Sequence, residues 1–114
     1  MGLVTLDQAH TTFCMPDGQT SNGRETWTLV QNPNSSAVSV EIGYLTPSGT
    51  GDQYLTVSIP ANSRRSFNMS DKIPAGRAAV RVICKTPGKK IMCERAMYWN
   101  PRGTGTDTVG GFWD

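Results

Sequence analysis

The chain has 114 residues, of which 37% are hydrophobic and 18% charged, and its net charge at pH 7 is +2. A domain of this length buries roughly two thirds of its unfolded surface, so it folds without help from a metal or a disulfide. The charge is too low for a nucleic-acid-binding face, which needs concentrated Lys and Arg. No apolar run approaches the ~20 residues of a membrane-spanning helix, and we expect no membrane span.

The start of the chain bears on the compartment. No basic and apolar signal peptide follows Met1. We therefore expect a cytoplasmic protein if Met1 is the native start, and a cell-surface location if the chain is part of a longer exported protein. Three cysteines do not decide between these compartments, because any one pairing leaves a third thiol over.

The first part of the chain is weakly patterned. Residues 11–14 are typical of a short edge strand, and the following Met15-Pro16-Asp17-Gly18 is typical of a turn. Residues 25–31 predict a strand from their Thr, Trp and Val content, with Trp27 and Leu29 sharing one face.

The clearest alternation in the chain lies at residues 38–46, after a turn cluster at 32–36. Side chains of a strand point to opposite faces in turn, so one face of this segment is apolar. That face carries Val38, Val40, Ile42 and Tyr44. We expect this strand to form an antiparallel hairpin with residues 25–31.

Two more alternating segments follow. Residues 54–59 predict a strand with its Leu, Val and Ile inward, and residues 64–69 predict another with Phe67 and Met69 inward. Ser70-Asp71 is a candidate cap for a single helical turn before Pro74.

Residues 78–100 predict the central hairpin, with a tight turn at Pro87-Gly88-Lys89. A turn centred between Gly88 and Lys89 places Cys84 directly opposite Cys93. The chain then ends in a Gly- and Thr-rich tail, in which Phe112-Trp113 predicts a last edge strand.

The fold class follows from the repetition of these segments. Apolar residues nowhere recur at helical spacing over ten residues, so no long helix is expected. Seven to eight short strands predict one all-β domain over residues 1–114, an antiparallel β-sandwich. Within it, residues 1–10 and 101–114 are loose or pair at an edge. An open barrel is the alternative.

Three segments carry a resemblance to known proteins. They are ETWTLVQNPNSSAVSVEIGYLTPSG from residue 25, VSIPANSRRSFNMSDKIP from residue 57, and ERAMYWN from residue 94. Together they resemble a β-sandwich module repeated in bacterial cell-surface proteins of unassigned function. More distantly, the chain is similar to the sensory rhodopsin transducer family. The resemblance implies a sandwich without catalysis that presents a surface or binds sugars or partners. It implies no particular site residue.

Cys84 and Cys93 are the candidate disulfide. Opposed strand residues have Cβ atoms about 4.5–5.5 Å apart, within reach of a bridge after a small adjustment. The alternative is that both are buried free thiols, which behave as small apolar side chains. Neither cysteine belongs to a close-spaced set of metal ligands, and we expect no metal site.

Arg95 and the aromatic residues are the candidate ligand-binding groups. Arg95 lies among apolar neighbours and needs a partner if it is buried, for which Glu25, Glu41 and Asp71 are candidates. It serves either as an anion clamp or as one half of a buried ion pair. The aromatic residues most expected at the surface, as a platform for sugar rings, are Tyr54, Tyr98 and Trp113.

Together these patterns predict a non-catalytic interaction module without cofactors. It binds a carbohydrate or a protein partner, or a second copy of itself, through a sheet face or an edge. One alternative is a cytoplasmic, oligomeric signalling protein of the transducer kind. Another is a small thiol-dependent enzyme that uses Cys14 or Cys84, for which the sequence holds no supporting motif.

Overall fold

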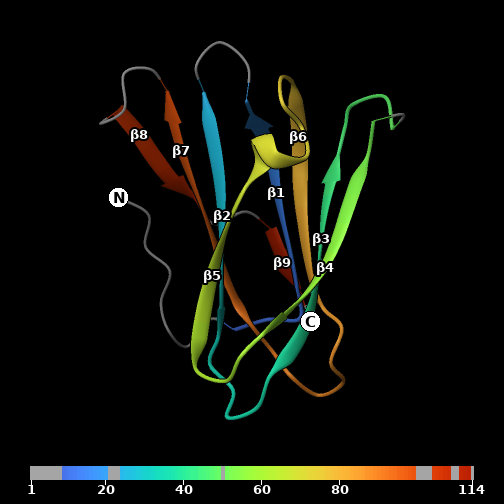
Figure 1. Cartoon of the computed structure of the whole chain (residues 1–114), viewed down its shortest axis with the longest axis vertical. Coiled ribbons are helices and arrows are strands. Elements are labelled where there is room, and N and C mark those ends of the chain that lie inside the picture. Colours follow the sequence, from blue (N-terminus) through green and yellow to red (C-terminus); the bar gives the residue numbers. More distant parts are fainter. Residues whose placement is uncertain (1–8, 21–23, 50, 100–103, 109–110, 114) are drawn as a thin grey trace.

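The computed structural model describes residues 9–20, 24–49, 51–99, 104–108 and 111–113. Two antiparallel sheets face each other in a sandwich (Figure 1). The five-stranded sheet, in spatial order, comprises β4 (Gln53–Ile59), β3 (Val38–Leu45), β6 (Arg77–Cys84), β1 (Thr12–Gln19) and β9 (Gly111–Trp113). The four-stranded sheet comprises β5 (Ser63–Asn68), β2 (Glu25–Asn32), β7 (Met92–Trp99) and β8 (Thr104–Thr108). The predicted all-β sandwich is confirmed.

Two hairpins predicted from the sequence are wrong: the one that joins β2 to β3 and the one that joins β6 to β7. β2 and β3 lie in different sheets, and so do β6 and β7. A turn does form at 86–89, where the Lys89 N–H donates to the Thr86 carbonyl at 3.3 Å, but it lies within a connection between sheets. Alternation reports which face of a strand is buried and not which sheet holds it. Connections of five or more residues, at up to ~3.3 Å each, span the ~10 Å between two sheets.

The core lies between the sheets and follows the predicted faces. The apolar face of β3 is fully buried, as is that of β6, and Phe67 and Met69 point inward as expected. Leu55 and Val57 of β4 are partly buried and pack against the same cluster. The largest fully buried side chains are Tyr44, Phe13, Met15, Ile42, Ile59, Met69 and Ile91.

β1 differs from its prediction in place and length. It pairs with both β6 and β9, so it is an inner strand, and it continues through the expected turn to Gln19. Its register with β6 shifts between Met15 and Gly18, which marks a β-bulge. Pro16 and Asp17 of the expected turn therefore lie outside the ladder, which resumes at Gly18, and the strand continues because bulges tolerate such residues.

The bulge is matched by polar side chains from the other sheet. Thr26 is fully buried, and its hydroxyl donates to the Gln19 carbonyl at 2.7 Å and accepts from the Gln19 N–H at 2.9 Å. Arg95 reaches the same region and donates from Nη1 to the Pro16 carbonyl. Backbone groups of β1 at the bulge and just beyond it thus find partners across the sandwich, which is why this part of the core is polar.

Asn32 organises the opposite end of the sandwich. It is fully buried, and its Nδ2 donates to the carbonyls of Ser36, Ile59 and Pro60 at 2.9, 3.0 and 3.1 Å. Its Oδ1 accepts from the Asn34 N–H at 2.9 Å. One side chain therefore ties the β2–β3 connection to the β4–β5 turn, which explains the dense Asn-Pro-Asn cluster.

The ends of the chain match the prediction in part. The Phe112-Trp113 segment forms β9 at the edge of the five-stranded sheet, and β8 lies at an edge of the four-stranded sheet, within the tail that was expected to be loose or to pair at an edge. The single helical turn is the 3₁₀ helix η1 (Met69–Asp71), whose cap is Asn68: its Oδ1 accepts from the Ser70 N–H at 3.1 Å. Among the described residues, no helix is long and apolar enough to cross a membrane.

Candidate functional site

The four candidate ligand-binding residues do not come together. Tyr54 lies on β4, at the rim of the five-stranded sheet, and Tyr98 is half-buried on β7 of the other sheet (Figure 1). Arg95 points into the core and is 7% exposed. The backbone of Trp113 pairs with Thr12 in β9, and its side chain lies outside the described part of the structure. The two described aromatic candidates, Tyr54 and Tyr98, therefore lie in different sheets and form no common platform.

Tyr54 is the most accessible of the three whose side chains the structure describes. It is 50% exposed and is the only exposed large hydrophobic residue among those described. Its position is set by its neighbour on β3, Gly43, which lies directly opposite in the ladder. A Cβ at Gly43 would lie 3.0 Å from Tyr54 Cε1 and 3.8 Å from Leu45 Cδ2. The tyrosine ring therefore occupies the space that the glycine leaves on the outer face of the sheet.

A shallow hollow of about 280 Å³ lies on the five-stranded sheet, beside the last residue of β3 and the first residues of β6. Leu45 connects the hollow with Tyr54, because its side chain reaches toward the same glycine. The hollow is lined by Pro16, Leu45, Pro47, Arg77, Ala78 and Ala79. Leu45 thus lies near the exposed Tyr54 ring and also lines the hollow, and we call the ring, Leu45 and the hollow together the Tyr54 surface.

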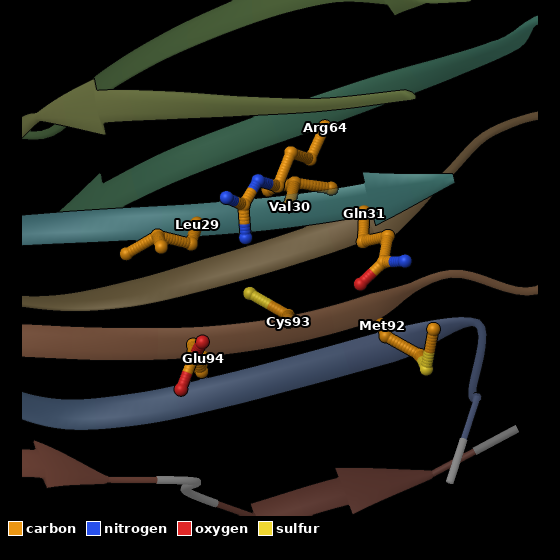
Figure 2. A pocket seen from close by; sticks show the side chains of 7 residues that line it. All are labelled: Leu29, Val30, Gln31, Arg64, Met92, Cys93 and Glu94. Atoms are coloured by element: carbon orange, nitrogen blue, oxygen red, sulfur yellow. The ribbon is translucent and has the colours of Figure 1, made fainter. Parts of the chain in front are cut away.

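A second hollow, of about 160 Å³, lies over β2 between β5 and β7 (Figure 2). Figure 2 shows Arg64 and Glu94 on either side of Cys93, with Gln31 and Met92 at the other end. It is lined by Leu29, Val30, Gln31, Arg64, Met92, Cys93 and Glu94. None of these lining residues is aromatic. This hollow offers less volume and no exposed ring.

Arg81 and Arg95 lie in different environments. Glu41, one of the carboxylates expected for Arg95, instead lies 3.8 Å from Arg81 on the outer face of the five-stranded sheet. Arg95 lies between the sheets and binds a backbone carbonyl, so the prediction of a Glu41 partner is wrong. The interior position favours a structural role for Arg95 over ligand binding, because a buried cation is not reached by a ligand.

The cysteines are all free, and the predicted disulfide geometry is absent. Cys84 pairs with Val40 in one sheet, and Cys93 pairs with Val30 in the other. Burial raises the pKa of the Cys93 thiol far above its ordinary value, and the neighbouring Glu94 adds to the shift. A thiol kept neutral in this way is a poor nucleophile. A thiol-dependent enzyme that uses Cys14 or Cys84 stays a prediction.

Sequence reasoning missed the contribution of Gly43 and Leu45 to the Tyr54 surface. A glycine interrupts the otherwise regular pattern of β3, and a glycine inside a strand often marks a close approach by another group. That signal pointed to position 43. Which side chain approaches it depends on the β3–β4 register, which the sequence does not give.

The fold and the Tyr54 surface define a small β-sandwich protein in which one of the described aromatic rings is exposed, on an outer sheet face. No family model and no curated protein matches the chain. Several solved structures share its fold, among them the following two. The Thermotoga maritima protein 1070 is similar with a TM-score of 0.75 and 14% identity, over 94% of this chain and 97% of that one. The Anabaena sensory rhodopsin transducer is similar with a TM-score of 0.57 and 14% identity, over 78% of this chain and 97% of that one. The predicted likeness to the transducer is thus confirmed for the fold.

Proposed function

We propose that the protein is a non-catalytic binding module that takes a carbohydrate on the Tyr54 surface. The observation that carries the proposal is the half-exposed Tyr54 ring, which is supported from below by Gly43 and continues into a hollow through Leu45. Exposed apolar patches with a polar rim mark binding surfaces. A tyrosine suits a partly wet surface, because its ring is apolar and its hydroxyl forms hydrogen bonds.

A sugar fits this surface better than a compact ligand does. Sugar rings have apolar C–H faces that pack on an aromatic ring and hydroxyl edges that hydrogen-bond around it. The hollow beside Tyr54 is open and shallow, and Arg77 lines it together with apolar residues. Small cofactors bind in pockets that bury most of their surface, which this open hollow does not do. The resemblance to repeat modules of bacterial cell-surface proteins supports the same carbohydrate-binding role.

The test is a glycan array followed by calorimetric titration of any sugar that binds. We expect Tyr54→Ala to weaken binding about tenfold or more, which corresponds to the loss of ~1.4 kcal/mol. Tyr54→Phe is the matched control, because it keeps the ring and should keep most of the affinity. If no sugar on the array binds but a protein partner does, the ligand of this surface is a protein and not a carbohydrate. Equal binding by the wild type and Tyr54→Ala would refute the site.

A second candidate is a signalling protein of the transducer kind, favoured by the fold shared with the Anabaena sensory rhodopsin transducer. In that case the ligand is a membrane-embedded sensory rhodopsin and not a sugar. Surface plasmon resonance against a detergent-solubilised sensory rhodopsin separates the two. Binding there together with a blank glycan array favours this candidate, and the reverse result favours the carbohydrate module.

A further inference from the structure

The free edge of β4 is unusual among the sheet edges of the described chain. Those edges are β4 and β9 in one sheet and β5 and β8 in the other. β5 carries two adjacent arginines, β8 has five residues with an aspartate among them, and β9 has three residues. β4 has seven residues, QYLTVSI, without charge or proline. Proteins normally protect long edges with charge, proline or bulges, because unprotected edges pair with other strands.

The register also leaves this edge regular. β4 pairs with β3 without a shift from Val38↔Ile59 to Tyr44↔Gln53, so no bulge bends it away. Its residues match the pleat, with Leu55 and Val57 half-buried against the core and the residues between them exposed. Figure 1 shows β4 at the outer rim beside β3.

The backbone groups at the free edge follow from the hydrogen bonds of β3. Ser39 donates its N–H to Thr86 Oγ1 and accepts at its carbonyl from the Lys85 N–H, both at 2.8 Å. The N–H and C=O groups of Ser39 therefore point away from β4. Ser58 lies opposite Ser39 in the ladder, so its N–H and C=O groups point away from β3. Because this direction alternates along a strand, the N–H and C=O groups of Tyr54, Thr56 and Ser58 all point to the free edge.

These three residues form a self-complementary set. In an antiparallel pairing centred on Thr56, each Thr56 faces the Thr56 of the other copy, and Tyr54 faces Ser58. All three then exchange N–H···O bonds with the second chain, and no other register uses all three. On the inner side, Leu55 faces Val57, which pairs apolar residues across the junction. No like charges meet, because β4 has none.

We propose that β4 is a homodimerisation edge, through which two copies pair antiparallel about a twofold axis at Thr56 and join their five-stranded sheets. The occupant is a second copy because the pairing is matched with itself at every position, as a twofold interface requires. Addition of a strand to an open sheet edge is an established way in which proteins associate. This inference is independent of the ligand on the Tyr54 surface.

The test is the mass of the full chain by analytical ultracentrifugation, without ligand, as a function of concentration. We expect the mass to rise from 12.4 kDa to twice that value. Thr56→Pro removes the N–H at the axis, which faces the free edge and has no role in the β3 ladder, so edge strands tolerate it. It should raise the dissociation constant of the dimer about tenfold or more. Thr56→Val keeps the N–H and should dimerise as the wild type does.

A second variant covers the case in which the proline prevents folding. Thr56→Lys is compatible with the fold, because Glu41 lies opposite position 56 on β3. In the dimer it places two lysines opposite each other, and dimerisation should weaken and recover with salt. A wild-type chain that stays at 12.4 kDa up to about 1 mM overturns the proposal. So does a dimer that neither the proline nor the lysine affects.

Discussion

Arg95 on β7 donates a hydrogen bond to the backbone carbonyl of Pro16 on β1, and it thereby joins the two sheets at the β1 bulge. The arginine is almost fully buried, and Thr26 on β2 makes a similar contact with the Gln19 carbonyl, three residues further along β1. A feature that looked like a ligand clamp in the sequence is thus part of the core.

Replacement of this arginine should destabilise the fold. Arg95→Met keeps much of the side-chain volume and leaves the Pro16 carbonyl without its donor, which costs about 1–3 kcal/mol. The measurement is the free energy of unfolding in urea. Arg81→Met is the matched control: that pair is at 3.8 Å and about one third exposed, so its loss should cost less than ~1 kcal/mol. Equal effects of the two substitutions would contradict the buried role of Arg95.

Gly43→Ala should separate ligand binding from stability. The new Cβ would lie 3.0 Å from the Tyr54 ring, which must move, and the ring is half exposed and free to do so. We expect a stability change within about 1 kcal/mol, since alanine also lowers the conformational entropy of the unfolded chain. Ligand binding should fall as it does in Tyr54→Ala.

The control for this experiment is Gly51→Ala. The new Cβ would lie 3.3 Å from the Thr46 side chain, which is its nearest neighbour, and would touch no aromatic ring. It should leave ligand binding unchanged. Full ligand affinity in Gly43→Ala would mean that the tyrosine ring does not depend on the glycine for its position.

The stability of the protein should fall at alkaline pH because of Tyr44. Burial raises the pKa of Tyr44 from 10.0 to about 12, and the charge of Asp71 adds to the shift. The unfolded chain loses this proton near pH 10, whereas the folded chain keeps it until about pH 12. The stabilisation is therefore complete below pH 10 and is lost between pH 10 and 12, at ~1.4 kcal/mol per pH unit.

Urea unfolding of the wild type and Tyr44→Phe between pH 10 and 12 measures this effect. The phenylalanine variant has no proton to lose at this position, so its stability should decline less steeply. Burial of Cys93 raises the pKa of that thiol too, and the resulting decline is common to both chains. Parallel curves for the two proteins would show that the ionisation of Tyr44 is not coupled to folding.

The sequence alone determined the fold class and most of the buried positions. The alternation of Val38, Val40, Ile42 and Tyr44 predicted the core face of β3, and the inward places of Phe67 and Met69 were predicted in the same way. These predictions succeed because burial of every second side chain is a local property of a strand, written in neighbouring residues. The exposed Tyr54 was predicted for the same reason.

Only the tertiary structure decided which strands share a sheet, and with that the setting of every candidate residue. Cys84 and Cys93 were expected to face each other and instead lie in opposite sheets, and Glu41, a candidate partner of Arg95, instead lies beside Arg81. The pairing of Tyr54 with Gly43 likewise depends on the register of β3 and β4. Strand pairing is a competition among distant segments with similar apolar faces, so its outcome depends on the whole chain and is not encoded in any one stretch of it.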